Sequence, residues 1–249
     1  MFLKTFNIMD DSFVTDIVLQ DYRSSSVFRK YGIDYCCGGK IPLNTACEIR
    51  GLDLTTIKNE LNEVIRVIQI SSSVNFNDWD TDFLIDYITN VHHSSLLKNF
   101  PDIIETLQRF LTGHQSKYPY LCQLMDFVFR LRDNLLPHME QEEQIIFPYI
   151  KQIAHAYKNN ESYAALLVRT LRKPVENIMS HEHEYTKKYL YHIRELTNQY
   201  TPPANACISH KVSFLKLKEL DNELAQHLFL ENEILFPKAL KMEKELLIQ

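Results

Sequence analysis

Glycine and proline are scarce in this chain. Only five glycines and nine prolines occur in 249 residues. Because tight turns between strands depend on these residue types, their scarcity favours long helices over many short strands. Hydrophobic residues make up 45% of the sequence and charged residues 24%, which is typical of a soluble globular protein. The composition therefore predicts an all-α fold, long enough for a small domain and a larger one.

Further absences narrow the function. The 27 basic residues are outnumbered by 32 acidic ones, for a net charge of −5, which argues against a nucleic-acid binder. No run of about 18 apolar residues occurs, so we expect no membrane span. The first residues, MFLKTFNIMDDSF, become acidic too early for a signal peptide. The five cysteines are odd in number and lack disulfide-like spacing, so we expect a reducing, cytoplasmic location.

Hydrophobic periodicity predicts a small helical domain at residues 1–75. Short helices are expected at 12–22 and 24–33, and a further helix begins near Asp53, a plausible N-cap. Apolar residues recur there at helical spacing: Leu54, Ile57, Leu61, Val64, Ile65 and Ile68. Residues 71–80 have the composition of a linker.

Residues 76–249 are expected to form a second domain. Four long helical segments are predicted at 81–112, 118–150, 162–198 and 208–246. The segments between them are rich in turn-forming residues, and Pro101 and Pro174 should kink or interrupt the helices that contain them. Four amphipathic helices of this length predict a four-helix bundle.

The stretch DYCCGGK places Cys36 and Cys37 side by side, ahead of two glycines. Adjacent residues of an extended chain point to opposite faces, so the pair is poorly arranged to grip one metal ion together. The glycines favour a tight, exposed turn, and Lys40 can favour the thiolate form. We interpret the turn as a place where sulfur is presented. The remaining cysteines lack partners in spacing and are expected to be buried thiols: Cys47, Cys122 and Cys207.

An internal repeat is the most informative feature. The frame H-x-x-x-E-x-x-I-[IL]-F-P occurs as HMEQEEQIIFP at 138–148 and as HLFLENEILFP at 227–237, 89 residues apart. A histidine and a glutamate four residues apart share one helix face. The two pairs are His138 with Glu142 and His227 with Glu231.

Flanking residues indicate that these faces turn inward. Leu135 and Ile145 are apolar and lie three residues before and seven after His138, on about the same face. The repeat also distinguishes two neighbouring acids, because Asn232 stands where the first frame has Glu143. Only the glutamate four residues after each histidine has a counterpart in the other frame.

Further histidines precede each frame: His92 and His93 before the first, and His181 and His183 before the second. His93 and His183 lie 45 and 44 residues ahead of the histidines of their frames. Two such units, packed around a pseudo-twofold axis, would bring four histidines and two glutamates into one core. Spacing alone does not choose between the two histidines of each pair.

Two inward glutamates argue for a metal centre. A lone inward histidine is usually a core residue with a satisfied hydrogen bond, but an unpaired buried carboxylate costs several kcal/mol. No lysine or arginine faces either frame, and a surface helix would not repeat the apolar I-[IL]-F-P beside it. Imidazole and carboxylate ligands suit iron, manganese or zinc, and bridging carboxylates in a helical bundle favour a di-iron centre. Two histidines and two carboxylate oxygens per ion leave an open position for a small molecule.

The stretch FRKYGIDYCCGGK, followed by the two frames, resembles the iron–sulfur cluster repair di-iron proteins, the Repair of Iron Centres family. The resemblance covers nearly the whole chain. It implies a hemerythrin-like four-helix bundle, two non-haem iron ions, and a role in restoring Fe–S clusters damaged by nitric oxide or oxidants. It also implies the ligand set, with both glutamates as bridges: His93, His138, Glu142, His183, His227 and Glu231.

Three functions compete at this stage. In the leading one, the di-iron centre supplies iron to damaged Fe–S proteins, and Cys36 and Cys37 accept iron, exchange thiols with the client or carry a redox signal. For the cysteines, the alternative is a structural turn. The second function is an enzyme that couples two nitric oxide molecules at a diferrous site. The third is an oxygen or nitric oxide sensor, which the symmetric ligand set disfavours. The assembly is left open between a monomer and a homodimer.

Overall fold

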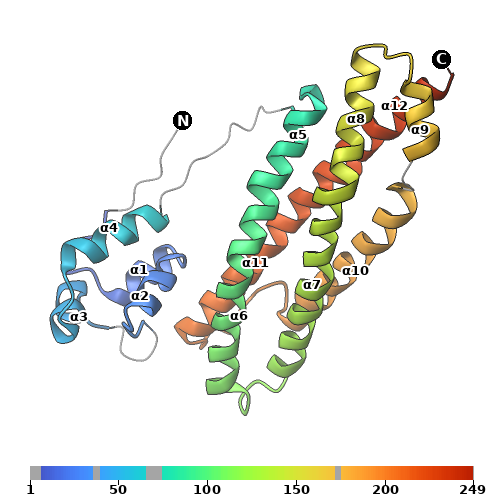
Figure 1. The fold of residues 1–249 in the computed structure, drawn as a ribbon. Helices are drawn as coiled ribbons and strands as arrows, with labels where there is room; N and C mark the ends of the chain where they lie inside the picture. The colour runs from blue at the N-terminus through green and yellow to red at the C-terminus, as the bar shows by residue number, and fades with distance from the viewer. Residues whose placement is uncertain (1–6, 36–39, 66–74, 172–174, 249) are drawn as a thin grey trace. The chain divides into compact units, whose positions relative to one another are not determined.

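The computed structural model describes residues 7–35, 40–65, 75–171 and 175–248 (Figure 1). For residue 171 and residues 175–182 it describes the backbone but not the side chains. Every regular element within these ranges is a helix, which confirms the all-α prediction. No helix in the described part of the chain is long and apolar enough to cross a membrane.

Contacts divide the chain into two compact units. One contains Met1–Val74 with Thr106–His114 and Thr197–Lys218, and the other contains Asn75–Glu105, Gln115–Leu196 and Glu219–Gln249. The first unit therefore takes in parts of two long helices as well as the N-terminal residues. A domain boundary at residue 75 stays a prediction.

The N-terminal helices are short. They are α1 (Val14–Gln20), α2 (Ser24–Lys30), α3 (Leu43–Arg50) and α4 (Leu54–Ile65). The predicted cap of α4 is present, since Asp53 Oδ2 accepts the backbone N–H of Thr56 at 2.8 Å. Helix α3 was not predicted, although Pro42 precedes it and Gly51, at φ 64°, ends it in the left-handed conformation. These helices bury the apolar side chains of Val14, Ile17, Phe28, Leu43, Ile57 and Leu61.

The four predicted long segments are present, and three of them contain a π-helical turn. The first is α5 (Thr81–Tyr87), η2 (Ile88–His93) and α6 (Ser94–His114). The second is α7 (Leu121–Gln141), η3 (Glu142–Ile146) and α8 (Phe147–Lys158). The third is α9 (Ala164–Leu171) and α10 (Val175–Leu196). The fourth is α11 (Ile208–Phe229), η4 (Leu230–Leu235) and α12 (Phe236–Ile248).

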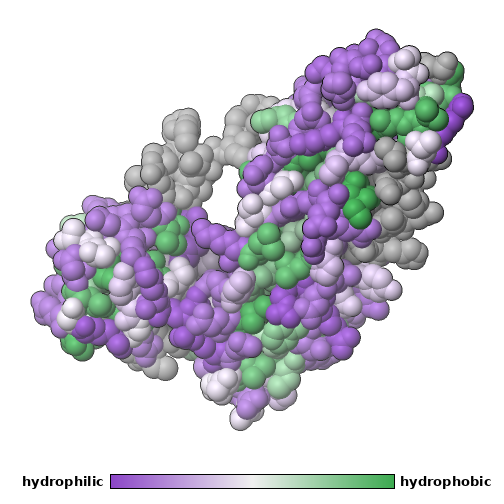
Figure 2. All heavy atoms as spheres, in the orientation of Figure 1, coloured by the Kyte–Doolittle hydropathy of each residue, from purple (hydrophilic) through white to green (hydrophobic). Residues whose placement is uncertain are grey.

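The second unit is built on these long helices. Helix α7 packs against α10, α8 against α5 and α12, and α12 against α9 (Figure 1). The core includes Leu84, Ile88, Ile146, Ile150, Leu230 and Leu235. Hydrophilic residues cover most of the visible face, with hydrophobic ones in small groups (Figure 2). Helix α6 continues through Pro101, so the alternative of an interruption there is wrong, whereas a kink stays a prediction. Pro174 lies outside the described residues.

A proline of the repeat follows each of two π-turns, η3 and η4. Proline has no N–H, so it cannot donate to the carbonyl four residues earlier. For Pro148 and Pro237 those carbonyls belong to Gln144 and Glu233, which lie inside η3 and η4. A π-turn adds one residue to the helix and thereby rotates the later residues about the helix axis. The sequence placed Ile145 inward, and this is wrong, because its side chain is 43% exposed.

The extra residue of η3 moves the core position along by one. Ile146 is fully buried in place of its neighbour, whereas Leu135, which precedes the turn, is buried as expected. The periodicity of an ordinary α-helix therefore describes the frame up to Glu142 and fails after it.

Candidate metal centre

The six histidines and glutamates that were expected to bind metal come from four long helical segments. His93 ends η2, His138 is in α7, Glu142 begins η3, His183 is in α10, His227 is in α11 and Glu231 is in η4. Each is at most 2% exposed. The structure brings them together in two groups that share both glutamates.

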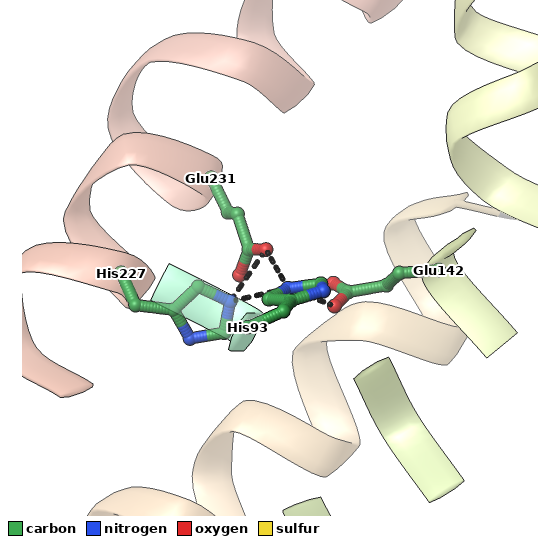
Figure 3. A group of neighbouring side chains, drawn as sticks. All are labelled: His93, Glu142, His227 and Glu231. Carbon is green, nitrogen blue, oxygen red and sulfur yellow. Dashed lines mark hydrogen bonds and ion pairs between the residues drawn. The ribbon is translucent and has the colours of Figure 1, made fainter. Parts of the chain in front are cut away.

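In the first group His93 and His227 face Glu142 and Glu231 (Figure 3). The Nε2 atoms of the two histidines lie 3.0 Å apart. Glu231 Oε1 is 2.8 Å from His227 Nε2 and 3.8 Å from His93 Nε2. Glu142 Oε2 is 3.5 Å from His93 Nε2. Four potential ligand atoms therefore surround one point.

The second group repeats this arrangement with His138 and His183, whose Nε2 atoms lie 2.9 Å apart. Here Glu142 directs its other oxygen, Oε1, to within 3.2 Å of His138 Nε2. Glu231 directs Oε2 to within 3.4 Å of His183 Nε2. Each carboxylate thus points one oxygen toward each histidine pair, which is the geometry of a bridging ligand.

The donor set fits a bound cation. Among the described residues, no carboxylate oxygen of Glu142 or Glu231 makes a well-aligned hydrogen bond, although histidine nitrogens lie close to them, and all four oxygens are buried. Burying such groups without compensation costs several kcal/mol. Positive charge between the paired imidazoles and the shared carboxylates removes that cost. The two groups can therefore hold metal ions.

Glu143 and Asn232 were not expected to take part in the site. Each lies beside the Nδ1 atom of an upstream histidine, the ring nitrogen that faces away from its group. His93 Nδ1 lies 2.7 Å from Glu143 Oε1, and His183 Nδ1 lies 2.9 Å from Asn232 Oδ1. A carboxylate or amide oxygen only accepts, so each Nδ1 carries the proton and each Nε2 presents its lone pair inward. The aligned positions of the two frames contained this signal, but the change from glutamate to asparagine concealed it.

The phenylalanine of each frame packs on the same histidine. Phe147 stacks on His93 with ring centroids 5.7 Å apart and an interplanar angle of 22°. Phe236 stacks on His183 at 6.2 Å and 25°. Both phenylalanines make the same contact with an upstream histidine. This shared contact explains why the phenylalanine recurs in the frame together with the histidine and the glutamate. Each phenylalanine ring stacks on an imidazole and thereby restricts the orientation of that imidazole.

The shared carboxylates differ in their proton affinity. Burial raises the pKa of Glu142, and the nearby charge of Glu231 raises it further. Burial also opposes ionisation of Glu231, but His227 outweighs it and holds the pKa of Glu231 well below its usual range.

The upstream histidines differ as well. Burial alone would lower the pKa of His93, but the carboxylates of Glu231 and Glu142 outweigh it and raise the pKa. Burial lowers the pKa of His183 in spite of the opposing charge of Glu231.

Among the described side chains, the other upstream histidine, His92, takes no part in either group. His92 is buried and its Nδ1 lies 2.8 Å from Glu223 Oε1. The side chain of His181 lies outside the described residues. His93 and His183, which the family resemblance implied, both lie in a group, and of the first upstream pair His93 and not His92 does so.

The cysteines give a mixed outcome. Cys36 and Cys37 lie outside the described residues. Cys47 is buried as expected, but Cys122 is exposed and Cys207 is half-buried, so the expectation of buried thiols is wrong for both. Cys207 Sγ lies 3.4 Å from His114 Nε2.

Four inward imidazoles and two shared inward carboxylates in a helical bundle define a hemerythrin-like cation-binding protein. The comparison with known families agrees. Residues 85–239 match the hemerythrin HHE cation binding domain, and residues 10–65 match a domain of unknown function, DUF542.

Full-length relatives narrow the family. The chain is 32% identical to the iron–sulfur cluster repair protein ScdA of Staphylococcus haemolyticus, covering 93% of this chain and 99% of the relative. It is 33% identical to the iron–sulfur cluster repair protein YtfE of an Enterobacter species, covering 92% and 96%. The chain belongs to the hemerythrin HHE family and, within it, to the group of iron–sulfur cluster repair proteins that includes ScdA and YtfE.

Proposed function

We propose that the protein binds two non-haem iron ions and uses them to repair Fe–S clusters damaged by nitrosative or oxidative stress. The observation that carries this proposal is the pair of buried carboxylates, each of which directs one oxygen to either histidine pair. The names of the ScdA and YtfE relatives support the repair role.

The proposed ligands divide evenly. His93 and His227 bind one ion, His138 and His183 bind the other, and the two glutamates bridge them. Mixed imidazole and carboxylate donors suit iron, and the shared carboxylates in a bundle core are typical of di-iron proteins. When bound, iron supplies redox chemistry and an open position for nitric oxide or oxygen.

The donor atoms also suit iron transfer. Carboxylate oxygens and imidazole nitrogens are harder ligands than the thiolates that hold iron in clusters, so thiolate-rich sites compete well for ferrous iron. Damaged Fe–S proteins in the cytoplasm are the proposed clients. Cys36 and Cys37 are proposed to take part in the transfer. A homodimer is proposed as one assembly.

Metal analysis and a repair assay test the proposal. Protein from iron-replete cells should contain about two irons per chain, as expected for a carboxylate-bridged pair. Under anaerobic conditions it should restore the activity of an Fe–S enzyme inactivated by nitric oxide. Zinc or manganese in place of iron would contradict the proposal. Nitrous oxide formation from nitric oxide, without enzyme recovery, would favour a nitric oxide reductase instead.

The cysteine pair has its own test. A protein with Cys36→Ala and Cys37→Ala should keep its full iron content but repair the damaged enzyme more slowly, because the thiols act outside the metal site. The exposed Cys122→Ala variant is the matched control and should repair at the normal rate. Normal repair by the double variant would reduce the pair to a structural turn.

A further inference from the structure

The upstream histidines of the two pairs, His93 and His183, differ in the partner of their outer nitrogen. His93 Nδ1 contacts the carboxylate of Glu143 at 2.7 Å, whereas His183 Nδ1 contacts the amide oxygen of Asn232 at 2.9 Å. Each acceptor directly follows the shared glutamate of its frame, so the two acceptors are equivalent under the pseudo-twofold repeat. One outer partner carries a negative charge and the other is neutral.

This difference acts on the metal-facing nitrogen. An acceptor at Nδ1 fixes the tautomer and polarises the ring, and an ionised acceptor polarises it more strongly than a neutral one. The Nε2 atom of His93 is therefore the better electron donor of the two. Glu142 and Glu231 offer a carboxylate oxygen to each group, so the number of carboxylate ligands does not distinguish the two positions.

We propose that Glu143 makes the two metal positions unequal, so that the ion between His93 and His227 is held more tightly than the ion between His138 and His183. This inference rests on the proposed function, since it requires two bound ions. The position whose histidine has the amide partner then releases iron first. The other ion stays behind and keeps the shared carboxylates in place.

The solvent exposure of Glu143 determines how strongly its charge changes the metal affinity. Loss of an outer partner costs about 10- to 100-fold in metal affinity. The side chain of Glu143 is 39% exposed, so solvent screens part of its charge. We therefore expect an effect near the lower end, about 10-fold. The same exposure means that a substitution there leaves the core intact.

Stepwise titration of the full chain with ferrous iron tests the inference, using a competing chelator under anaerobic conditions. The wild-type protein should bind two ions in separate steps. Glu143→Gln should weaken the tighter step about 10-fold, so that the two steps converge. Asn232→Asp should strengthen the weaker step. Glu233→Gln makes the same charge change on an exposed residue of η4 and should alter neither.

Mössbauer spectra give a readout that a loss of folding would not imitate. With one equivalent of ⁵⁷Fe, the wild-type protein should show mainly one quadrupole doublet, and Glu143→Gln should show two. Equal steps in the wild type, or identical results for Glu143→Gln and Glu233→Gln, would overturn this inference alone. Binding of fewer than two ions by the wild type would overturn the proposed function and this inference with it.

Discussion

Replacement of Glu142 by leucine should have opposite effects on the metal-free and the iron-loaded protein. Glu142 is completely buried, and among the described residues neither of its carboxylate oxygens makes a well-aligned hydrogen bond. Without metal, burial and Glu231 raise its pKa and favour the neutral form. A buried neutral group without a partner costs about 1–3 kcal/mol. The metal-free Glu142→Leu protein should therefore be more stable by about that amount.

Iron should reverse the order. A ligand at 100 times its dissociation constant stabilises a protein by about 2.7 kcal/mol per site. The wild type should gain this at both positions, whereas Glu142→Leu lacks a ligand that both positions share. Iron should therefore make the wild type the more stable of the two.

Thermal unfolding with chelator and with ferrous iron measures both effects. For a unit of this size, 1 kcal/mol corresponds to roughly 2–4 °C, so the metal-free variant should melt about 2–12 °C higher. Glu140→Leu, on the exposed face of α7, is the matched control and should bind iron normally. A less stable metal-free Glu142→Leu protein, or one that keeps two irons, would refute the reasoning.

Five further substitutions probe the fold of the second unit. Phe236→Ala should lower the unfolding free energy by about 3–5 kcal/mol and weaken iron binding. Phe229 is half-exposed, so Phe229→Ala is the control and should do neither. Denaturant titration measures the stability of each variant, and metal analysis measures its bound iron. Ile146→Ala should cost about 2–5 kcal/mol and Ile145→Ala less than about 0.5 kcal/mol, and equal costs in denaturant would contradict the π-turn. Asp80→Ala should remove the N-cap of α5 at about 1 kcal/mol. Hydrogen bonds lower the pKa of Asp80, so its carboxylate stabilises the folded protein at neutral pH. This stabilisation is lost as the pH falls through the pKa of Asp80 in the folded protein. On acid titration, the unfolding free energy of the wild type should therefore converge on that of the variant.

The sequence predicted the fold class, and the repeat pointed to four residues of the two groups, because it applies the same geometric constraint twice: His138, Glu142, His227 and Glu231. A histidine and a glutamate four residues apart share a face in any α-helix, and two copies leave little room for coincidence. The choice of His93 over His92 came from the family resemblance. In the structure the two neighbours point to different partners, Glu223 for His92 and Glu143 for His93.

What the sequence missed depended on departures from ordinary helix geometry. Ile145 was placed inward because the pattern assumed 3.6 residues per turn, and η3 breaks that assumption. Glu143 was set aside because its counterpart is Asn232, although both oxygens accept from a histidine. Helix α3 was missed because its eight residues contain few apolar positions at regular spacing.

The π-turns bear on how the protein behaves after its iron has gone. Helices normally fray at their ends, and their central amides exchange hydrogen with solvent most slowly. Here η2, η3 and η4 interrupt the regular α-helical hydrogen bonding in mid-helix, beside the histidines and glutamates that metal would tie together. In the metal-free protein, amide exchange should therefore be fastest at mid-helix rather than at the ends, and metal should suppress it there. The metal-free protein would thus be less rigid than the iron-loaded protein in the central parts of its helices. Binding iron again would remove this difference.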